Sequence, residues 1–279
     1  MEEEGQRPKL RKRRVRPIIR IIFGIIVVIL VIVVIVVLAL ALRRTSEHEA
    51  FKAVFTSRCK AYEGGYDCER TWNAFEQAYV GKDPCMVPPD SYQALMDATP
   101  FKPACNRMMF WSKTKNVVHD FTSKRECFIT IEDTFLGSLL DGLTWCGKEG
   151  SKDTFTSDCP GWTSCVNNTV RSFWNKASAS YAEVACGNVS VMLNGSIATP
   201  FHPASIFASI EMKNFNPVIM NSLNVVLVTQ EKKVSNCSSQ SLKDLQKVLD
   251  KGIAYSCKEV PESQIQECAS QSKTCGSCW

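Results

Sequence analysis

The residues of this sequence that could do chemistry are carboxylates and tryptophans, since it has no nucleophile elbow, P-loop or dinucleotide-binding GxGxxG motif. Glu211 ends a short apolar run that we expect to be a strand, and Glu132 and Asp133 fall in the first turn of an expected helix. Trp111 and Trp174 lie at helical spacing from other apolar residues. A carboxylate stabilises a developing positive charge, and an aromatic face attracts a cation. Each residue taken alone also fits an ordinary role, in the core, in solvent or at a helix N-terminus.

Residues 21–42 form an uninterrupted apolar segment that contains no charge and no hydroxyl group. A helix of this length covers roughly 33 Å, enough to cross a hydrocarbon core of about 30 Å. A secretory signal peptide would have a shorter apolar core and a small-residue cleavage site, whereas Arg43 and Arg44 follow here. We therefore expect an uncleaved transmembrane helix.

The charges on either side of this helix predict its orientation. Residues 1–20 contain eight Lys and Arg against three Glu. By the positive-inside rule, residues 1–20 are a cytoplasmic tail and the C-terminal part lies outside, as in a single-pass type II protein of the plasma membrane. After the span we expect a polar stalk over residues 43–57, a helical lobe over 58–187 and an α/β lobe over 188–279.

The composition of the predicted ectodomain limits its partners. It has 23 basic and 25 acidic residues after residue 44, so we expect no nucleic-acid partner. All fourteen cysteines lie in this part, where an oxidising compartment favours disulfides. The Cys275-Gly-Ser-Cys278 spacing could suggest zinc, but no second CxxC or HxxxH pair accompanies it and the three histidines are scattered, so we expect no metal. Four Asn-X-Ser/Thr sequons agree with an extracellular location. They begin at Asn167, Asn188, Asn194 and Asn236.

The first half of the ectodomain has mostly helical apolar spacing. Asp90 is an expected N-cap, and residues 130–133 resemble a capping box that opens a helix running to Leu140. Further helices are expected over residues 71–79, 106–121 and 170–185.

After Cys186 the period changes to short runs rich in Val, Ile and Leu, which are typical of strands buried on both faces. These runs cover residues 189–193, 207–212, 224–229 and 253–257. A helical pattern over 241–251 separates the last two, which predicts a parallel pair joined by a right-handed crossover. The fold class is therefore α/β, with a helical N-terminal lobe and a small parallel-sheet lobe, in a disulfide-rich ectodomain on one transmembrane helix. Ligands of such sheets bind beyond the carboxyl ends of the strands.

Five sequence blocks in order resemble the ADP-ribosyl cyclase and cyclic ADP-ribose hydrolase family. They are Phe110-Trp-Ser, Thr130-Ile-Glu-Asp-Thr-Phe-Leu-Gly, Leu143-Thr-Trp-Cys-Gly, Ser172-Phe-Trp, and Val191-Met-Leu-Asn-Gly-Ser followed by Phe207-Ala-Ser-Ile-Glu. The resemblance extends from about residue 59 to residue 268. Together with the anchor, it favours the membrane-bound NAD glycohydrolases of vertebrate leukocytes within that family.

The resemblance implies cleavage of the nicotinamide–ribose bond of NAD to ADP-ribose and cyclic ADP-ribose, and hydrolysis of cyclic ADP-ribose. NAD is then a substrate, and no cofactor or metal is needed, because nicotinamide leaves as a neutral base and a carboxylate stabilises the oxocarbenium-like centre. On the family pattern Glu211 is that carboxylate, and Trp174 stacks on nicotinamide. Glu132 influences whether water or adenine meets the intermediate, and Trp111 closes the pocket. The implied binding residues also include Ser112, Lys113, Asp133, Asp141, Ser178, Ser205, Ile206 and Phe207.

Three positions depart from the family pattern. Lys113 stands where relatives have arginine, which keeps the charge but loses a bidentate contact with phosphate. Gly142 replaces a second acid after Asp141, and Ile206 replaces a small hydroxyl residue.

The resemblance also implies a disulfide pattern, in which a bridge between Cys105 and Cys186 holds the two sides of the cleft together. Cys127 and one C-terminal cysteine have no family partner, and could be free, bonded to each other, or used between the subunits of a homodimer. The other implied pairs are Cys59 with Cys68, Cys85 with Cys165, Cys146 with Cys159, Cys237 with Cys257, and Cys268 with Cys275 or Cys278.

A catalytically silent receptor or adhesion module with the same fold is the alternative, because a glycosylated, disulfide-rich ectodomain suits it equally well. The combination of Glu211 with Trp111, Glu132 and Trp174 favours the enzyme, since a binding module has no need of that set.

Overall fold

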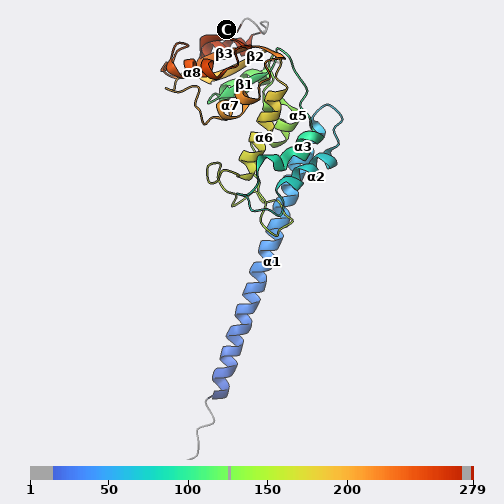
Figure 1. The fold of residues 1–279 in the computed structure, drawn as a ribbon. Coiled ribbons are helices and arrows are strands. Elements are labelled where there is room, and N and C mark those ends of the chain that lie inside the picture. Colours follow the sequence, from blue (N-terminus) through green and yellow to red (C-terminus); the bar gives the residue numbers. More distant parts are fainter. Residues whose placement is uncertain (1–14, 125–126, 272–277) are drawn as a thin grey trace, which may run out of the picture.

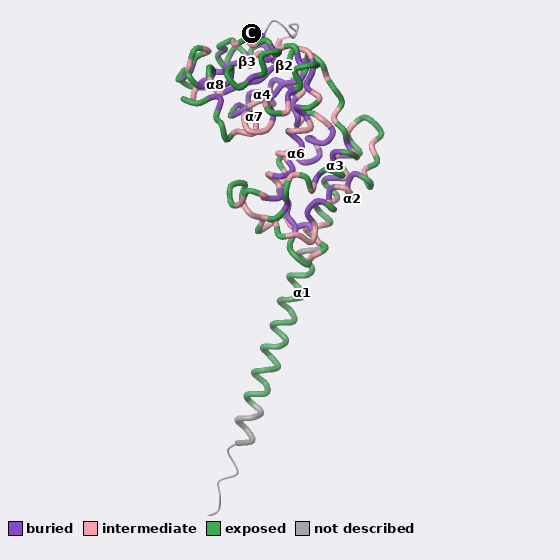
Figure 2. The backbone as a smooth tube through the Cα atoms, in the orientation of Figure 1, coloured by how far each residue is buried: buried purple, intermediate pink, exposed green. Residues whose placement is uncertain are grey.

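A long N-terminal helix leads into a two-lobed body (Figure 1). The computed structural model describes residues 15–124, 127–271 and 278–279, with side chains outside 15–20 and 44–46. Helix α1 (Val15–Ala61) contains the apolar segment 21–42, whose residues are exposed along its length (Figure 2). Among the described helices, it is long and apolar enough to cross a membrane. This apolar helix and the disulfide-rich body are consistent with a type II surface protein.

The end of α1 belongs to the body of the protein. Phe51 and Phe55 are buried in the helical lobe, and the Phe55 ring lies 5.1 Å from the Trp72 ring and 5.3 Å from the Phe75 ring. This corrects the expected polar stalk over residues 43–57, which is helical throughout and partly buried. Phe51 and Phe55 are one helical turn apart, so a single face of α1 enters the core.

The helical lobe contains α2 (Cys68–Tyr79) and α6 (Thr169–Glu183), which confirm the helices expected over 71–79 and 170–185. Asp90 does not cap a helix as expected, since Pro88 holds the N-cap position of η1 (Pro89–Tyr92), the 3-10 turn before α3 (Gln93–Ala98). The capping box at Thr130 is present, but the helix after it is split. A 3-10 turn, η2 (Ile131–Asp133), precedes α5 (Phe135–Leu140), because Thr134 leaves the helical conformation and caps α5.

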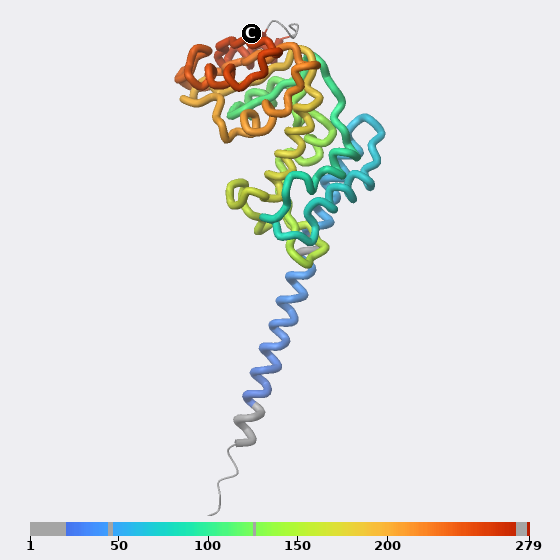
Figure 3. The backbone as a smooth tube through the Cα atoms, viewed as in Figure 1, coloured from blue at the N-terminus to red at the C-terminus, as the bar shows by residue number. Residues whose placement is uncertain are grey.

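Four parallel strands in the order β1-β2-β3-β4 form the sheet of the second lobe. Helix α8 (Gln240–Val248) joins the last two, which confirms the expected strand–helix–strand crossover. The edge strand β4 is mostly exposed, rather than buried on both faces as expected. The strands are β1 (Met109–Ser112), β2 (Gly187–Asn194), β3 (Met220–Thr229) and β4 (Ala254–Pro261). In Figure 3 the orange and red C-terminal segments make up most of this lobe, with β1 inserted from the green part of the chain.

Two expected elements are wrong. The helix expected over 106–121 is β1 followed by α4 (Lys115–Lys124), because residues 109–112 pair with 190–193 of β2. The strand expected over 207–212 is instead the short helix α7 (Ile206–Ser209) and the 3-10 turn η3 (Glu211–Asn214). Ser205 caps α7 by accepting a hydrogen bond from the Ala208 N–H. Short apolar runs do not distinguish buried strands from buried helical segments.

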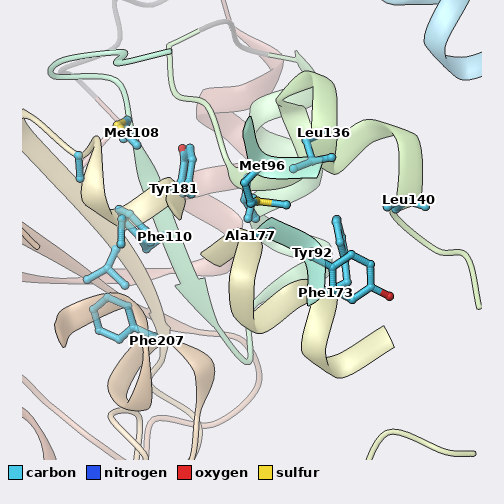
Figure 4. Packing of buried hydrophobic residues seen from close by; sticks show 14 of the residues in the cluster. Tyr92, Met96, Met108, Phe110, Leu136, Leu140, Phe173, Ala177, Tyr181 and Phe207 are labelled. Carbon is cyan, nitrogen blue, oxygen red and sulfur yellow. The ribbon is translucent and has the colours of Figure 1, made fainter. Parts of the chain in front are cut away.

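Two cores lie on opposite faces of the sheet. Val191 of β2 faces a large core that continues into the helical lobe, whereas Met192 faces a smaller core under α4 and α9 (Glu262–Ser270). Figure 4 shows Phe110 of β1, Phe207 of α7 and Tyr181 of α6 around the large core. The Phe110 and Tyr181 rings are 5.1 Å apart. Because this core crosses from one lobe to the other, it fixes α6 against the sheet.

Six disulfides in the described residues agree with the pattern implied by the resemblance. Cys268 pairs with Cys278, which selects one of its two proposed partners. Cys127 is also disulfide-bonded and therefore not free, whereas Cys275 lies outside the described residues. The other five pairs are Cys59–Cys68, Cys85–Cys165, Cys105–Cys186, Cys146–Cys159 and Cys237–Cys257.

Candidate active site

Glu211 begins η3, and only 6% of its surface is exposed. Ser178, in the third turn of α6, lies beside the Glu211 carboxylate, so residues of the two lobes meet at this point. Burial raises the pKa of Glu211 to about 8; the neighbouring Ser178 hydroxyl opposes this rise, and the charge of Glu132 adds to it. Glu211 is therefore a carboxylate on which any nearby positive charge has a large effect.

Glu132 and Trp111 form a second pair of site residues. The Trp111 indole Nε1 on β1 donates a hydrogen bond of 3.2 Å to Oε2 of Glu132 on η2. The Glu132 side chain is 8% exposed. Burial raises its pKa, while the charge of His119, the hydrogen bond from Trp111 and the neighbouring Thr130 side chain oppose the rise. Two buried carboxylates, Glu132 and Glu211, thus act on each other electrostatically at the junction of the lobes.

Helix α6 presents Trp174 and Ser178 on one face, because they are one turn apart. Asn168 caps this helix by accepting a hydrogen bond from the Arg171 N–H. The Trp174 ring is half-buried and lies edge-on to the buried ring of Phe173, 5.0 Å away. Trp174 is therefore held on one side by the core and partly open on the other, on the helix face that reaches Glu211.

Two basic residues near these residues were missed in the sequence. Lys115 and His119 are one turn apart on α4, and each faces an acid of the helical lobe. Lys115 Nζ is 2.9 Å from Oδ1 of Asp141, and His119 Nε2 is 3.6 Å from Oε2 of Glu132. Their four-residue spacing places them on one face of a helix. This face was not recognised in the sequence, because the single helix expected over 106–121 also covered β1.

The sequence-predicted residues of the sheet lobe lie around the carboxyl end of β1. Ser112 is buried as the last residue of this strand. Lys113 follows with a φ of 60°, and its carbonyl oxygen accepts a hydrogen bond from the Asn194 side chain. Ser205 and Ile206 begin α7, which contacts β1. This end of β1 is the side on which parallel sheets bind ligands.

Some predicted site residues have other contacts. Asp133 uses its carboxylate to accept hydrogen bonds of 2.8 Å from the N–H and hydroxyl groups of Thr130. The Phe207 side chain is buried in the core. The Cys105–Cys186 disulfide precedes β1 and β2, so it fixes the amino ends of the two strands rather than the end that holds Trp111. No cluster of metal-ligating side chains is found in the described part of the chain.

Comparison with known proteins adds to this geometry. The model of the ADP-ribosyl cyclase family matches residues 48–277, which include all of these site residues. The chain belongs to the ADP-ribosyl cyclase family. The apolar segment of α1 lies outside the match, whereas the end of α1 that enters the helical lobe lies within it.

Relatives of this chain within the ADP-ribosyl cyclase family occur in the rat and in Aplysia californica. It is 34% identical over 226 residues to the rat "ADP-ribosyl cyclase/cyclic ADP-ribose hydrolase 1", covering 77% of this chain and 74% of the relative. It is 32% identical to the "ADP-ribosyl cyclase/cyclic ADP-ribose hydrolase" of the sea hare Aplysia californica, covering 76% of this chain and 80% of the relative.

Solved structures of the ADP-ribosyl cyclase family share the fold. Porcine CD38 with a covalent intermediate superimposes with a TM-score of 0.71 at 35% identity, over 76% of this chain and 96% of that chain. The Aplysia cyclase complexed with the substrate NGD and the product cGDPR superimposes with a TM-score of 0.72 at 30% identity, over 78% and 92%. The α/β fold class expected from the sequence is therefore confirmed.

Proposed function

We propose that this protein cleaves the nicotinamide–ribose bond of NAD to ADP-ribose and cyclic ADP-ribose, and hydrolyses cyclic ADP-ribose. The observation that supports this most directly is Glu211, a carboxylate buried beside the Ser178 hydroxyl. An ionised carboxylate in such surroundings is poorly solvated, so it interacts strongly with a cation placed beside it.

Glu211 is the proposed catalytic carboxylate. Burial raises its pKa to about 8, so it is mostly protonated in the free enzyme at neutral pH. NAD carries a positively charged pyridinium ring, and an adjacent opposite charge favours the ionised carboxylate. Binding of NAD therefore drives loss of the Glu211 proton. The carboxylate then stabilises the oxocarbenium-like centre that forms as neutral nicotinamide leaves.

The two tryptophans have proposed roles in substrate binding. Trp174 is half-buried on the helix face that reaches Glu211, so its ring can stack on nicotinamide. Trp111 closes the pocket, and its indole is held by Glu132. Glu132 then influences whether water or the adenine ring meets the intermediate. The chemistry needs no metal and no bound cofactor, because the leaving group departs as a neutral base.

The remaining proposed roles concern substrate binding and location. We assign the phosphates and riboses of NAD to the carboxyl end of β1 and the start of α7, and the nicotinamide amide to the neighbourhood of Asp141. The apolar part of α1 would anchor the protein in the plasma membrane, with the tail of residues 1–20 in the cytoplasm and the disulfide-rich body outside. A homodimer in the membrane is compatible with this arrangement.

The test is turnover of NAD by the full chain and by Glu211→Gln, with the products separated by chromatography. The substitution keeps the volume and removes the charge, so we expect a loss of about 100-fold or more in kcat with the fold intact. Glu231→Gln, which removes an exposed carboxylate after β3, serves as the control. A Glu211→Gln variant that kept more than about a tenth of the wild-type rate would contradict the assignment. A folded wild-type chain that left NAD intact would instead favour a silent receptor or adhesion module.

A further inference from the structure

His119 has an unsatisfied nitrogen inside the site. Its Nε2 atom is buried and has no hydrogen-bond partner among the described residues, although the side chain as a whole is 24% exposed. A buried polar atom without a hydrogen bond costs free energy, so its presence calls for a functional or structural reason. The nearest charged group to this nitrogen is the carboxylate of Glu132, whose Oε2 atom lies 3.6 Å away.

The contacts of His119 converge with those of Trp111. The Glu132 oxygen that faces His119 is the same one that accepts the indole hydrogen bond of Trp111 at 3.2 Å. The His119 ring also lies edge-on to the Trp111 ring, with centroids 5.7 Å apart and an interplanar angle of 82°. One carboxylate oxygen is thus contacted from two directions, by a hydrogen bond from Trp111 of β1 and by the His119 nitrogen of α4 at 3.6 Å.

We propose that His119 is a positioning residue that holds the Glu132 carboxylate, and Trp111 through it, and thereby sets the ratio of cyclic ADP-ribose to ADP-ribose. This inference rests on the proposed function. His119 touches no reacting atom in this account. It acts by keeping the Glu132 oxygen in place and by favouring the charged form of that carboxylate.

The direction of the effect follows from the chemistry of the two products. Hydrolysis requires a water molecule at the ribose centre, and an ionised carboxylate accepts a hydrogen bond from such a water. Cyclisation requires the adenine ring there and a drier surrounding. Burial disfavours the charge on Glu132, and the charge of His119 opposes this. Loss of His119 therefore leaves Glu132 more often neutral and less firmly held, which favours cyclisation.

A packing role for the histidine ring predicts a different result, and the chain offers a matched control. In the helical lobe, His48 Nδ1 lies 3.8 Å from Oε1 of Glu76, and its ring is edge-on to Trp72 at 6.0 Å and 77°. This group has the same three residue types with a similar ring geometry, but its hydrogen bonds differ. His48 Nδ1 accepts a hydrogen bond from the Thr154 N–H, and Trp72 Nε1 has no hydrogen-bond partner among the described residues. It joins α1 to α2 and includes none of the proposed site residues.

The experiment measures the molar ratio of the two products from NAD, using the full chain and its variants at one pH. His119→Phe keeps a ring against Trp111 and removes the nitrogens, so we expect the cyclic fraction relative to ADP-ribose to rise about threefold or more. His119→Gln restores a donor that reaches the carboxylate, and should return the ratio toward the wild-type value. His48→Phe should leave the ratio unchanged.

A double variant tests whether His119 acts through Glu132. In a Glu132→Gln background, His119→Phe should cause no further change in the ratio, because the group it holds is already altered. If His119→Phe does not fold, His119→Asn must give the same rise, since its shorter amide does not reach the carboxylate.

The outcomes separate this inference from the proposed function. An unchanged ratio in His119→Phe, with NAD still consumed, overturns the inference alone. An equal change in His48→Phe, or no recovery in His119→Gln, also overturns it. A wild-type chain that consumes no NAD overturns the proposed function.

Discussion

The hydroxyl group of Ser178 on α6 of the helical lobe lies beside the carboxylate of Glu211 on η3 of the sheet lobe. Burial raises the pKa of this carboxyl group to about 8, and the hydroxyl opposes the rise. The relative position of the two lobes therefore influences how readily Glu211 ionises.

Ser178→Ala should shift the acid side of the pH profile of kcat/KM to higher pH. Removing a hydroxyl that favours the charged form raises the pKa of Glu211 further, by about one unit if the interaction contributes about 1.5 kcal/mol. The measurement is the pH dependence of NAD cleavage at low substrate concentration, which reports ionisation in the free enzyme. Ser172→Ala is a suitable control, because Ser172 is a buried serine of the same helix whose hydroxyl has no described partner. If the acid side of the pH profile stayed in place in Ser178→Ala, or moved to lower pH, the assigned role of Ser178 would be contradicted.

Glu211→Gln should make the protein more stable than the wild type at pH 8, by a larger margin than at pH 5. The pKa of Glu211 rises from the ordinary 4.5 to about 8 on folding, so between these values the folded state binds more protons than the unfolded state. Wild-type stability therefore falls as pH rises through this window, by at most about 1.4 kcal/mol per unit from this group. Glutamine does not titrate, so Glu211→Gln does not lose stability in this way as pH rises. The measurement is the unfolding free energy of the wild type and of Glu211→Gln at pH 5 and at pH 8. If the two proteins differed by the same amount at both pH values, the raised pKa of Glu211 would be contradicted.

Ile206→Thr should lower the cyclic fraction of the products while total consumption of NAD stays within a few-fold. Ile206 is half-buried in the first turn of α7, next to the cap residue Ser205. Its apolar side chain favours a folded substrate, and about 40 Å² of buried apolar surface is worth roughly 1 kcal/mol, or about five-fold in a ratio. Ile219→Thr, at an exposed isoleucine before β3, is the control. The idea fails if chromatography finds an unchanged or larger cyclic fraction in Ile206→Thr.

Local patterns in the sequence predicted the elements in which apolar residues are continuous or recur at regular spacing. The apolar run of α1, the Val-rich strands β2 and β3, and helix α6 agree with expectation because burial on one or both faces imposes composition directly. Residues 109–112 and 206–209 are short apolar runs without such a signal. Residues 109–112 became a strand because β2 pairs with them, and residues 206–209 became a helix because Ser205 caps them.

The sequence by itself determined which residue types are available for the chemistry: two glutamates, two tryptophans and the blocks that resemble the family. Only the tertiary structure decided which of these residues meet, how far they are buried and whether they are charged. Ser178 and Glu211 meet because a shared core fixes α6 against the sheet, and burial there raises the pKa of Glu211. Trp111, His119 and Glu132 lie on three different elements. No local spacing in the sequence therefore indicates that Trp111 and His119 contact the same oxygen atom of Glu132. Charge states of this kind depend on desolvation and on groups distant in sequence, neither of which a local pattern contains.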